Sequence, residues 1–159
     1  MTQDASFHEG GEAPLNLKAM DNEDLQIIST LVQDAVFPAA EMKWDRAGRR
    51  FALLINRFRW EDAKAANQRN RAFERVQSVV MVEDILNVSS QGVERGDADM
   101  ILSLLSIEFE PGADGTGRLV LNLAGDAAIA LDVETLDLTL KDVTRPYIAP
   151  SRHQPSHDT

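Results

Sequence analysis

The residues of this chain best suited to chemistry are arginines that gather in one segment. Residues 43–75 hold ten of the 16 basic residues and only four acidic ones, so this segment carries a formal charge of +6. The rest of the chain therefore carries −16, because the whole chain carries −10. Arginines can bind phosphate groups, and aromatic side chains beside them can stack on nucleic-acid bases. The arginines that we predict as candidates for binding an anion or a partner are Arg49, Arg50, Arg57, Arg59, Arg71 and Arg75.

The same segment also has a structural interpretation, which we favour. In the strand predicted over residues 50–60, Phe58 and Trp60 fall on one face, while Arg57 and Arg59 fall on the other. A protein with a large negative charge repels a polyanion. We therefore expect core aromatics backed by arginines that pair with acidic strands. Binding of a nucleic acid or nucleotide through segment 43–75 stays open as the alternative.

Carboxylates offer a second kind of chemistry. Glu108 and Glu110 share one strand face, and Asp132 and Glu134 share another. If these side chains converged in a concave pocket, they could bind a hard cation and form a metal-dependent hydrolase. Alternating acids are, however, typical of the solvent face of a half-buried strand. No catalytic or metal-binding residue is predicted on this ground.

Several familiar kinds of catalysis are not expected. The chain has no cysteine, and its three histidines are His8, His153 and His157, all near the termini. A histidine base or a thiolate nucleophile within the fold is thus not expected. The glycine-rich residues 112–117 precede a predicted strand, whereas a phosphate-binding loop would lead into a helix. We expect no cofactor and do not favour an enzyme.

Composition indicates one globular domain. Of the 159 residues, 43% are hydrophobic and 26% are charged, which is an ordinary balance for a folded domain. Residues 1–14 and 150–159 are predicted to be a disordered leader and tail around a single domain over residues 15–149. No stretch approaches the about 18 to 20 apolar residues of a membrane span. The expected location is the cytoplasm, without membrane contact.

The strongest helix signal covers residues 22–35. Asp21 can cap this helix, and Pro38 would stop it. Its apolar residues recur at helical spacing, which predicts a helix that lies on a sheet. They are Leu25, Ile28, Leu31, Val32 and Ala35.

Most other segments alternate apolar and polar residues, as strands do. Strands are predicted at residues 15–19, 42–44, 50–60, 73–92, 101–110 and 118–123, and from residue 129; the last three form a meander. Residues 61–72 indicate a loop or a short exposed helix. Residues 134–143 fit a strand or a helix, and the strand is preferred. In strand 101–110, the side chains expected to point inward are Ile101, Leu105, Ile107 and Phe109.

These elements predict an α+β fold. We expect a mainly antiparallel, curved sheet or open barrel of about six to eight strands, with one main helix packed on it. The segments at residues 45–56 and 114–122 are similar to each other, each with an acidic turn, a Gly-Arg pair and an apolar run that ends in asparagine. Two hairpin turns or a true internal repeat would both explain this similarity.

Four short segments carry a resemblance to a known family. They are NRFRWE (residues 56–61), FERVQSV (73–79), LSLLSIEFEPG (102–112) and AIALDVE (128–134). In this order and spacing they resemble a family of short, uncharacterised bacterial proteins of unknown function. The resemblance covers residues 15–143 and implies a bacterial cytoplasmic protein of one domain, with no known site.

For the function, we favour a non-catalytic binding or assembly protein. Curved sheets leave open edges, and the acidic and basic parts of this chain are complementary. A protein partner or a homo-oligomer is therefore expected before a nucleic acid.

Overall fold

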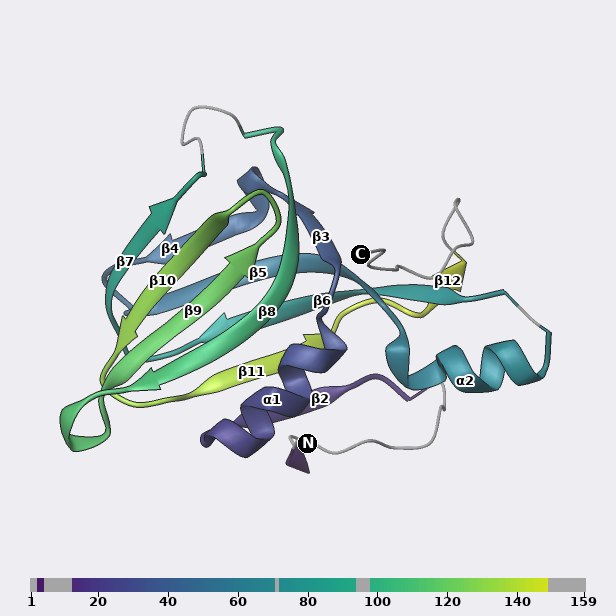
Figure 1. The fold of residues 1–159 in the computed structure, drawn as a ribbon, viewed down its shortest axis with the longest axis horizontal. Coiled ribbons are helices and arrows are strands. Elements are labelled where there is room, and N and C mark those ends of the chain that lie inside the picture. The colour runs from purple at the N-terminus through teal and green to yellow at the C-terminus, as the bar shows by residue number, and fades with distance from the viewer. Residues whose placement is uncertain (1–2, 5–12, 71, 94–97, 149–159) are drawn as a thin grey trace.

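The fold is built around one large, strongly bent sheet (Figure 1). The computed structural model describes residues 3–4, 13–70, 72–93 and 98–148. Twelve strands are found among the described residues, more than the six to eight predicted, although two of the twelve are only two residues long. The α+β class and the mainly antiparallel pairing are confirmed, because β1 with β2 is the one parallel pair among the described strands.

The elements follow one another along the chain as follows. The first strands are β1 (Gln3–Asp4), β2 (Asn16–Ala19), β3 (Ala35–Pro38), β4 (Met42–Asp45), β5 (Arg50–Phe58) and β6 (Glu74–Val82). The later strands are β7 (Ile85–Gln91), β8 (Ile101–Pro111), β9 (Gly117–Leu123), β10 (Ala127–Val133), β11 (Leu138–Asp142) and β12 (Tyr147–Ile148). The α-helices are α1 (Asn22–Leu31) and α2 (Trp60–Gln68), and the 3₁₀ helices are η1 (Ala39–Glu41) and η2 (Ala113–Gly115).

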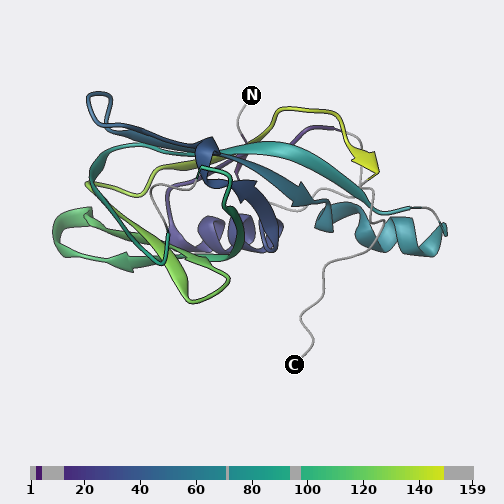
Figure 2. The ribbon, with the colours of Figure 1, turned by 90° about the horizontal axis from the view of Figure 1, so that it is seen from above.

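The sheet folds back on itself at β3. Its strand order is β1-β2-β11-β6-β5-β3-β8-β9-β10-β7, with β12 added to β6 and β4 added to β5. Strand β3 joins the halves, because it pairs with β8 over four residues and with β5 at Val36 and Asn56. Seen from above, the half with β5 and β6 lies across the half with β8, β9 and β10 (Figure 2). The sheet stays open, because its order ends at β1 and β7.

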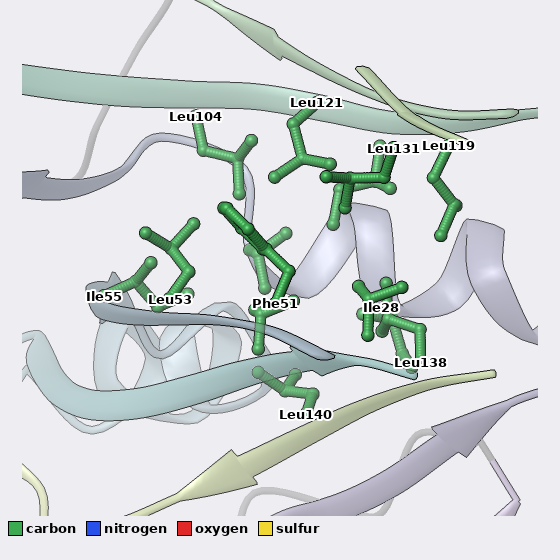
Figure 3. Packing of buried hydrophobic residues seen from close by; sticks show 14 of the residues in the cluster. Ile28, Phe51, Leu53, Ile55, Leu104, Leu119, Leu121, Leu131, Leu138 and Leu140 are labelled. Atoms are coloured by element: carbon green, nitrogen blue, oxygen red, sulfur yellow. The ribbon is translucent and has the colours of Figure 1, made fainter. Parts of the chain in front are cut away.

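The hydrophobic core lies between the two halves of the sheet. Figure 3 shows Leu104 and Leu121 of one half facing Phe51 and Leu53 of the other, with Ile28 of α1 beside them. These side chains are at most 3% exposed. Their burial is the main force that holds the bent sheet together.

Helix α1 begins as predicted and ends earlier. The Asp21 carboxylate accepts a hydrogen bond from the Asp24 N–H at 2.8 Å, which is the predicted cap. The helix ends at Leu31, and the prediction that it reaches residue 35 is wrong, because Asp34 has a φ of 63°. This left-handed backbone cannot continue a right-handed helix. Ala35 instead begins β3.

In β8 the inward face differs from the prediction. The buried residues are Leu102, Leu104 and Ile107, whereas Ile101 is 64% exposed. The pairing of β8 with β9 shifts between Leu104 and Ser106. This bulge adds one residue to the strand, so the alternation changes face in its middle.

The remaining predicted segments lie close to their expected places. For residues 61–72, where a loop or a short exposed helix was predicted, the structure has the helix α2. Helix α2 begins at Trp60, so the strand predicted over residues 50–60 already ends at Phe58. The preferred strand in 134–143 is confirmed by β11. Of the predicted leader, Gln3–Asp4 pairs with β2, and residues 1–2 and 5–12 lie outside the described residues, as does the predicted tail. Neither α-helix in the described part of the chain is long and apolar enough to cross a membrane.

Candidate binding site

Arg57, the central arginine of the predicted set, lies in the protein interior. Its side chain is 0% exposed, and its two terminal nitrogens bind the Glu61 carboxylate at 2.9 and 2.8 Å. Asp142 of β11 accepts a further bond at 3.0 Å, and Ser78 donates to the same carboxylate at 2.6 Å. Burial opposes the charge, but the hydrogen bonds that Arg57 donates to Glu61 and Asp142, together with their negative charges, outweigh it and raise the pKa of Arg57 above its ordinary value.

Arg59 is held in a similar way at the start of α2. Its side chain is 4% exposed and donates to the Glu74 carboxylate at 2.6 Å. The Asp62 carboxylate lies 3.7 Å away and that of Glu61 lies 3.8 Å away. Arg57 and Arg59 therefore fasten α2 to β6 and β11, and neither guanidinium faces solvent.

The other predicted arginines lie at separate places. Arg49 pairs with Glu134 at 3.0 Å, and Arg50 pairs with Glu83 at 2.9 Å. Arg75 is half-buried, and the loss of water around it lowers the pKa of its guanidinium.

Of the predicted arginines that the structure describes, Arg57 and Arg59 are buried, so the described members do not form one exposed face. Arg49, Arg50, Arg57 and Arg59 are paired with carboxylates, as the structural interpretation expected. Arg71 lies outside the described residues. A role of the arginine set in binding an anion or a partner stays a prediction.

The four carboxylates considered above for a metal site do not converge in one pocket. Arg118 of β9 lies opposite both Glu110 and Asp132 in the strand register and binds Asp132 at 2.8 Å. Glu108 is exposed, and Glu134 binds Arg49. Within the described ranges, no three acidic or histidine side chains are arranged to hold a metal ion. The concave carboxylate pocket that a hydrolase would need is therefore not formed by these four residues.

A different feature, the unpaired edges of β4 and β7, forms the candidate site. Among the described strands, β4 pairs only with β5, and β7 pairs only with β10. The two edges are fastened at one end, because the Ile85 N–H donates to the Arg49 carbonyl at 2.9 Å. Near the other end of β4, the Ala39 N–H of η1 donates to the Met100 carbonyl at 2.8 Å, which extends the pairing of β3 with β8. Both strands lie toward the left of Figure 1.

Between these two hydrogen bonds the inner side of the sheet is accessible. Met42 and Trp44 lie opposite the buried residues Leu53 and Phe51 in the register, so they point to the interior. On β7, Val88 lies opposite buried Leu131 and therefore points inward as well. Met42, Trp44 and Val88 are only half-buried, and no further strand among the described residues pairs with β4 or β7 along this stretch.

A cavity of about 380 Å³ opens between β4 and β7. We call it the β4–β7 cavity. Its lining includes the core residues Phe51 and Ile129, together with Trp44 and Val88. At the end near η1, Ala39 and Val93 line the cavity. Its polar lining residues are Arg46 and Ser90.

Arg46 gives the β4–β7 cavity its charge. It is the one charged residue among the described lining residues, and it is exposed. The other arginines of this hairpin, Arg49 and Arg50, are paired with glutamates. Arg46 forms no ion pair with any residue that the structure describes.

Sequence reasoning missed this site. The alternation of Met42 and Trp44 predicts a half-buried strand, but it contains no sign that the strand lacks a second neighbour. Strand β7, with Asn87, Ser89 and Ser90, has a weak strand pattern. This weakness was the one available signal of an edge.

The fold and the cavity define this chain as an α+β protein with a bent, open sheet and an apolar cavity between two of its edges. The chain belongs to the DUF2948 family of proteins of unknown function, whose model matches residues 15–157. The family resemblance drawn from the four segments is thereby confirmed. Comparisons with curated proteins and with solved structures found no match.

Proposed function

We propose that this protein is a non-catalytic binding protein whose ligand is a small, mainly apolar molecule held in the β4–β7 cavity. One observation carries the proposal: a cavity of about 380 Å³ reaches core residues Phe51 and Ile129 from the surface. Sites for small molecules are concave, mostly apolar and commonly about 300 to 1,000 Å³ in volume, with a few polar groups. A cytoplasmic location stays our expectation for this protein.

The position of the cavity supports this proposal. Half-exposed Trp44 and Val88 leave apolar surface in contact with water, and covering that surface with a ligand is favourable. The cavity walls are strands of one sheet, and the Ile85–Arg49 hydrogen bond holds the start of β7 beside the β4–β5 turn, so the site is formed without a ligand. A preformed site requires little ordering on binding, which favours affinity.

The two tryptophans of the chain allow a direct test. Trp44 lines the cavity, whereas Trp60 lies in α2 and donates its indole N–H to the Gln33 carbonyl at 3.0 Å. We expect 1-octanol, added to ¹⁵N-labelled protein, to shift the indole N–H signal of Trp44 in a saturable way. The Trp60 signal should stay in place and serves as the internal reference.

A matched pair of variants locates the binding. Val88→Phe should fill the cavity and abolish the octanol-dependent shift of Trp44. Ser89→Phe changes the next residue, whose side chain points to the other face of β7, and should leave the shift intact. If Trp44 does not respond to octanol, or responds equally in Val88→Phe, the protein does not bind through this cavity.

A second candidate function is association with a protein partner or with a second copy through the edge of β7. Natural edge strands are commonly protected by charged residues or proline. Strand β7 contains neither, and its outward residue Leu86 is 53% exposed. An unprotected edge can pair with a strand of another chain, which would also make this an assembly protein.

A further inference from the structure

We infer that the ligand of the β4–β7 cavity is amphipathic, with an apolar body and one carboxylate, and that Arg46 binds this carboxylate. The inference rests on the proposed function and specifies its ligand. Its basis is that an apolar cavity has in its lining a guanidinium that forms no ion pair with any described residue.

The charge of Arg46 is unusual for its surroundings. The chain carries −10 overall, and the neighbouring Arg49 and Arg50 are each paired with a glutamate. No acidic side chain is found among the described residues that line the cavity. A guanidinium that has no carboxylate partner in the described part of the chain, and that lines an apolar cavity, is complementary to an anionic group of a ligand.

The order of residues along β4 suggests the direction in which the ligand lies. Arg46 follows the last residue of β4, on the side of the β4–β5 turn, whereas Ala39 precedes the strand at the opposite end. The head group would thus lie at the turn, and the apolar body would extend past Trp44 and Val88 toward Ala39. Phe51 and Ile129 would contact its middle.

The size and the single cation narrow the ligand class further. A volume of 380 Å³ holds about a dozen groups the size of a water molecule, each of which occupies about 30 Å³. A chain or ring system of about eight to ten carbon atoms fits this space. One guanidinium balances the single charge of one carboxylate through two parallel hydrogen bonds, whereas a phosphate group, with a charge of about −1.5 to −2 and three acceptor oxygens, would stay partly uncompensated.

The test compares octanoate with 1-octanol, which share a chain of eight carbons and differ in the head group. The indole signal of Trp44 gives the dissociation constant of each probe. In Arg46→Met the affinity for octanoate, relative to that for octanol, should fall about tenfold, since a charge-assisted hydrogen bond is lost. Added salt should weaken octanoate binding in the wild-type protein, because the guanidinium is exposed.

Arg50→Met is the matched control. It removes a positive charge from the same hairpin, but Arg50 does not line the cavity, so the ratio of the two affinities should not change. If octanol binds and Arg46→Met leaves the ratio unchanged, the inference on the carboxylate is wrong while the proposed function stands. If neither probe binds to the wild-type protein, the proposed function itself fails.

Discussion

Replacing Arg57 with methionine should destabilise this protein more than any exposed charge substitution. The variant would leave Glu61 and Asp142 without their cation, and their side chains are only 7% and 4% exposed. Breaking a buried ion pair by removing one partner costs about 3 to 5 kcal/mol. The free energy of unfolding of natural domains is about 5 to 15 kcal/mol, so this loss would be a large share of the total.

Urea unfolding followed by circular dichroism measures the loss, with Arg50→Met as the control. Arg50 pairs with Glu83 at the surface, where its side chain is 50% exposed, so its removal should cost less than about 1 kcal/mol. If Arg57→Met costs no more than Arg50→Met, the buried network does not stabilise the fold.

Adding Asp142→Asn to Arg57→Met tests the cause. The amide can still accept hydrogen bonds from the Leu15 N–H and from Ser78, but it carries no charge. If the cost of Arg57→Met comes from uncompensated buried charge, the double variant should recover part of the lost stability. A further loss in the double variant would contradict that cause.

The pH dependence of this contribution follows from the direction of the pKa shift. A cation whose pKa is higher in the folded state than in the unfolded state adds stability below its unfolded pKa, and the gain is lost only as the pH rises through the folded value. Because the folded value of Arg57 lies above its already very high ordinary pKa, Arg57 stays charged throughout the neutral range. Its own titration should therefore not change the free energy of unfolding there.

Two further variants test the contact of α1 with the sheet and the edge of β7. The Ser29 hydroxyl oxygen accepts a buried hydrogen bond from the Ile107 N–H at 2.9 Å, so Ser29→Ala should reduce the free energy of unfolding in urea by about 1 to 3 kcal/mol. A loss near zero would mean that another group satisfies this N–H. If β7 forms an interface, sedimentation velocity should detect association of the wild-type protein as its concentration rises, and Ser89→Lys should weaken that association. A wild-type protein that stays monomeric at all concentrations would rule out self-association through β7.

Local patterns in the sequence predicted much of the fold. The stripe of Leu25, Ile28 and Leu31 located α1, and the alternation around Leu53 located β5. Both signals depend only on neighbouring residues and on one buried face. The features that escaped prediction depend on distant pairing or on a single backbone angle. The left-handed Asp34 and the bulge after Leu104 belong to this group.

One ion-pair partner of the buried Arg57 could not be predicted from the sequence either, because it also depends on distant pairing. Alternation correctly placed Arg57 on the face opposite Phe58. In β5 that face also holds the buried residues Leu53 and Ile55. It could not indicate that Asp142, 85 residues further along the chain, would neutralise the guanidinium there. The sequence therefore favoured a pairing of these arginines with acidic strands without identifying the partner, and Arg57 also stayed among the candidates for a binding surface.

Burial and availability for a ligand are opposed properties of an arginine. Taking a guanidinium out of water is costly unless carboxylates compensate it, so the most buried arginines must also be the most fully paired ones. Arg57 meets this condition within the protein and has little left to offer a ligand. Arg46 is exposed, has no ion-pair partner in the described part of the chain and lines an apolar cavity. Of the arginines in segment 43–75, Arg46 is therefore the first to test for function, although the interleaved aromatics had directed attention to Arg57.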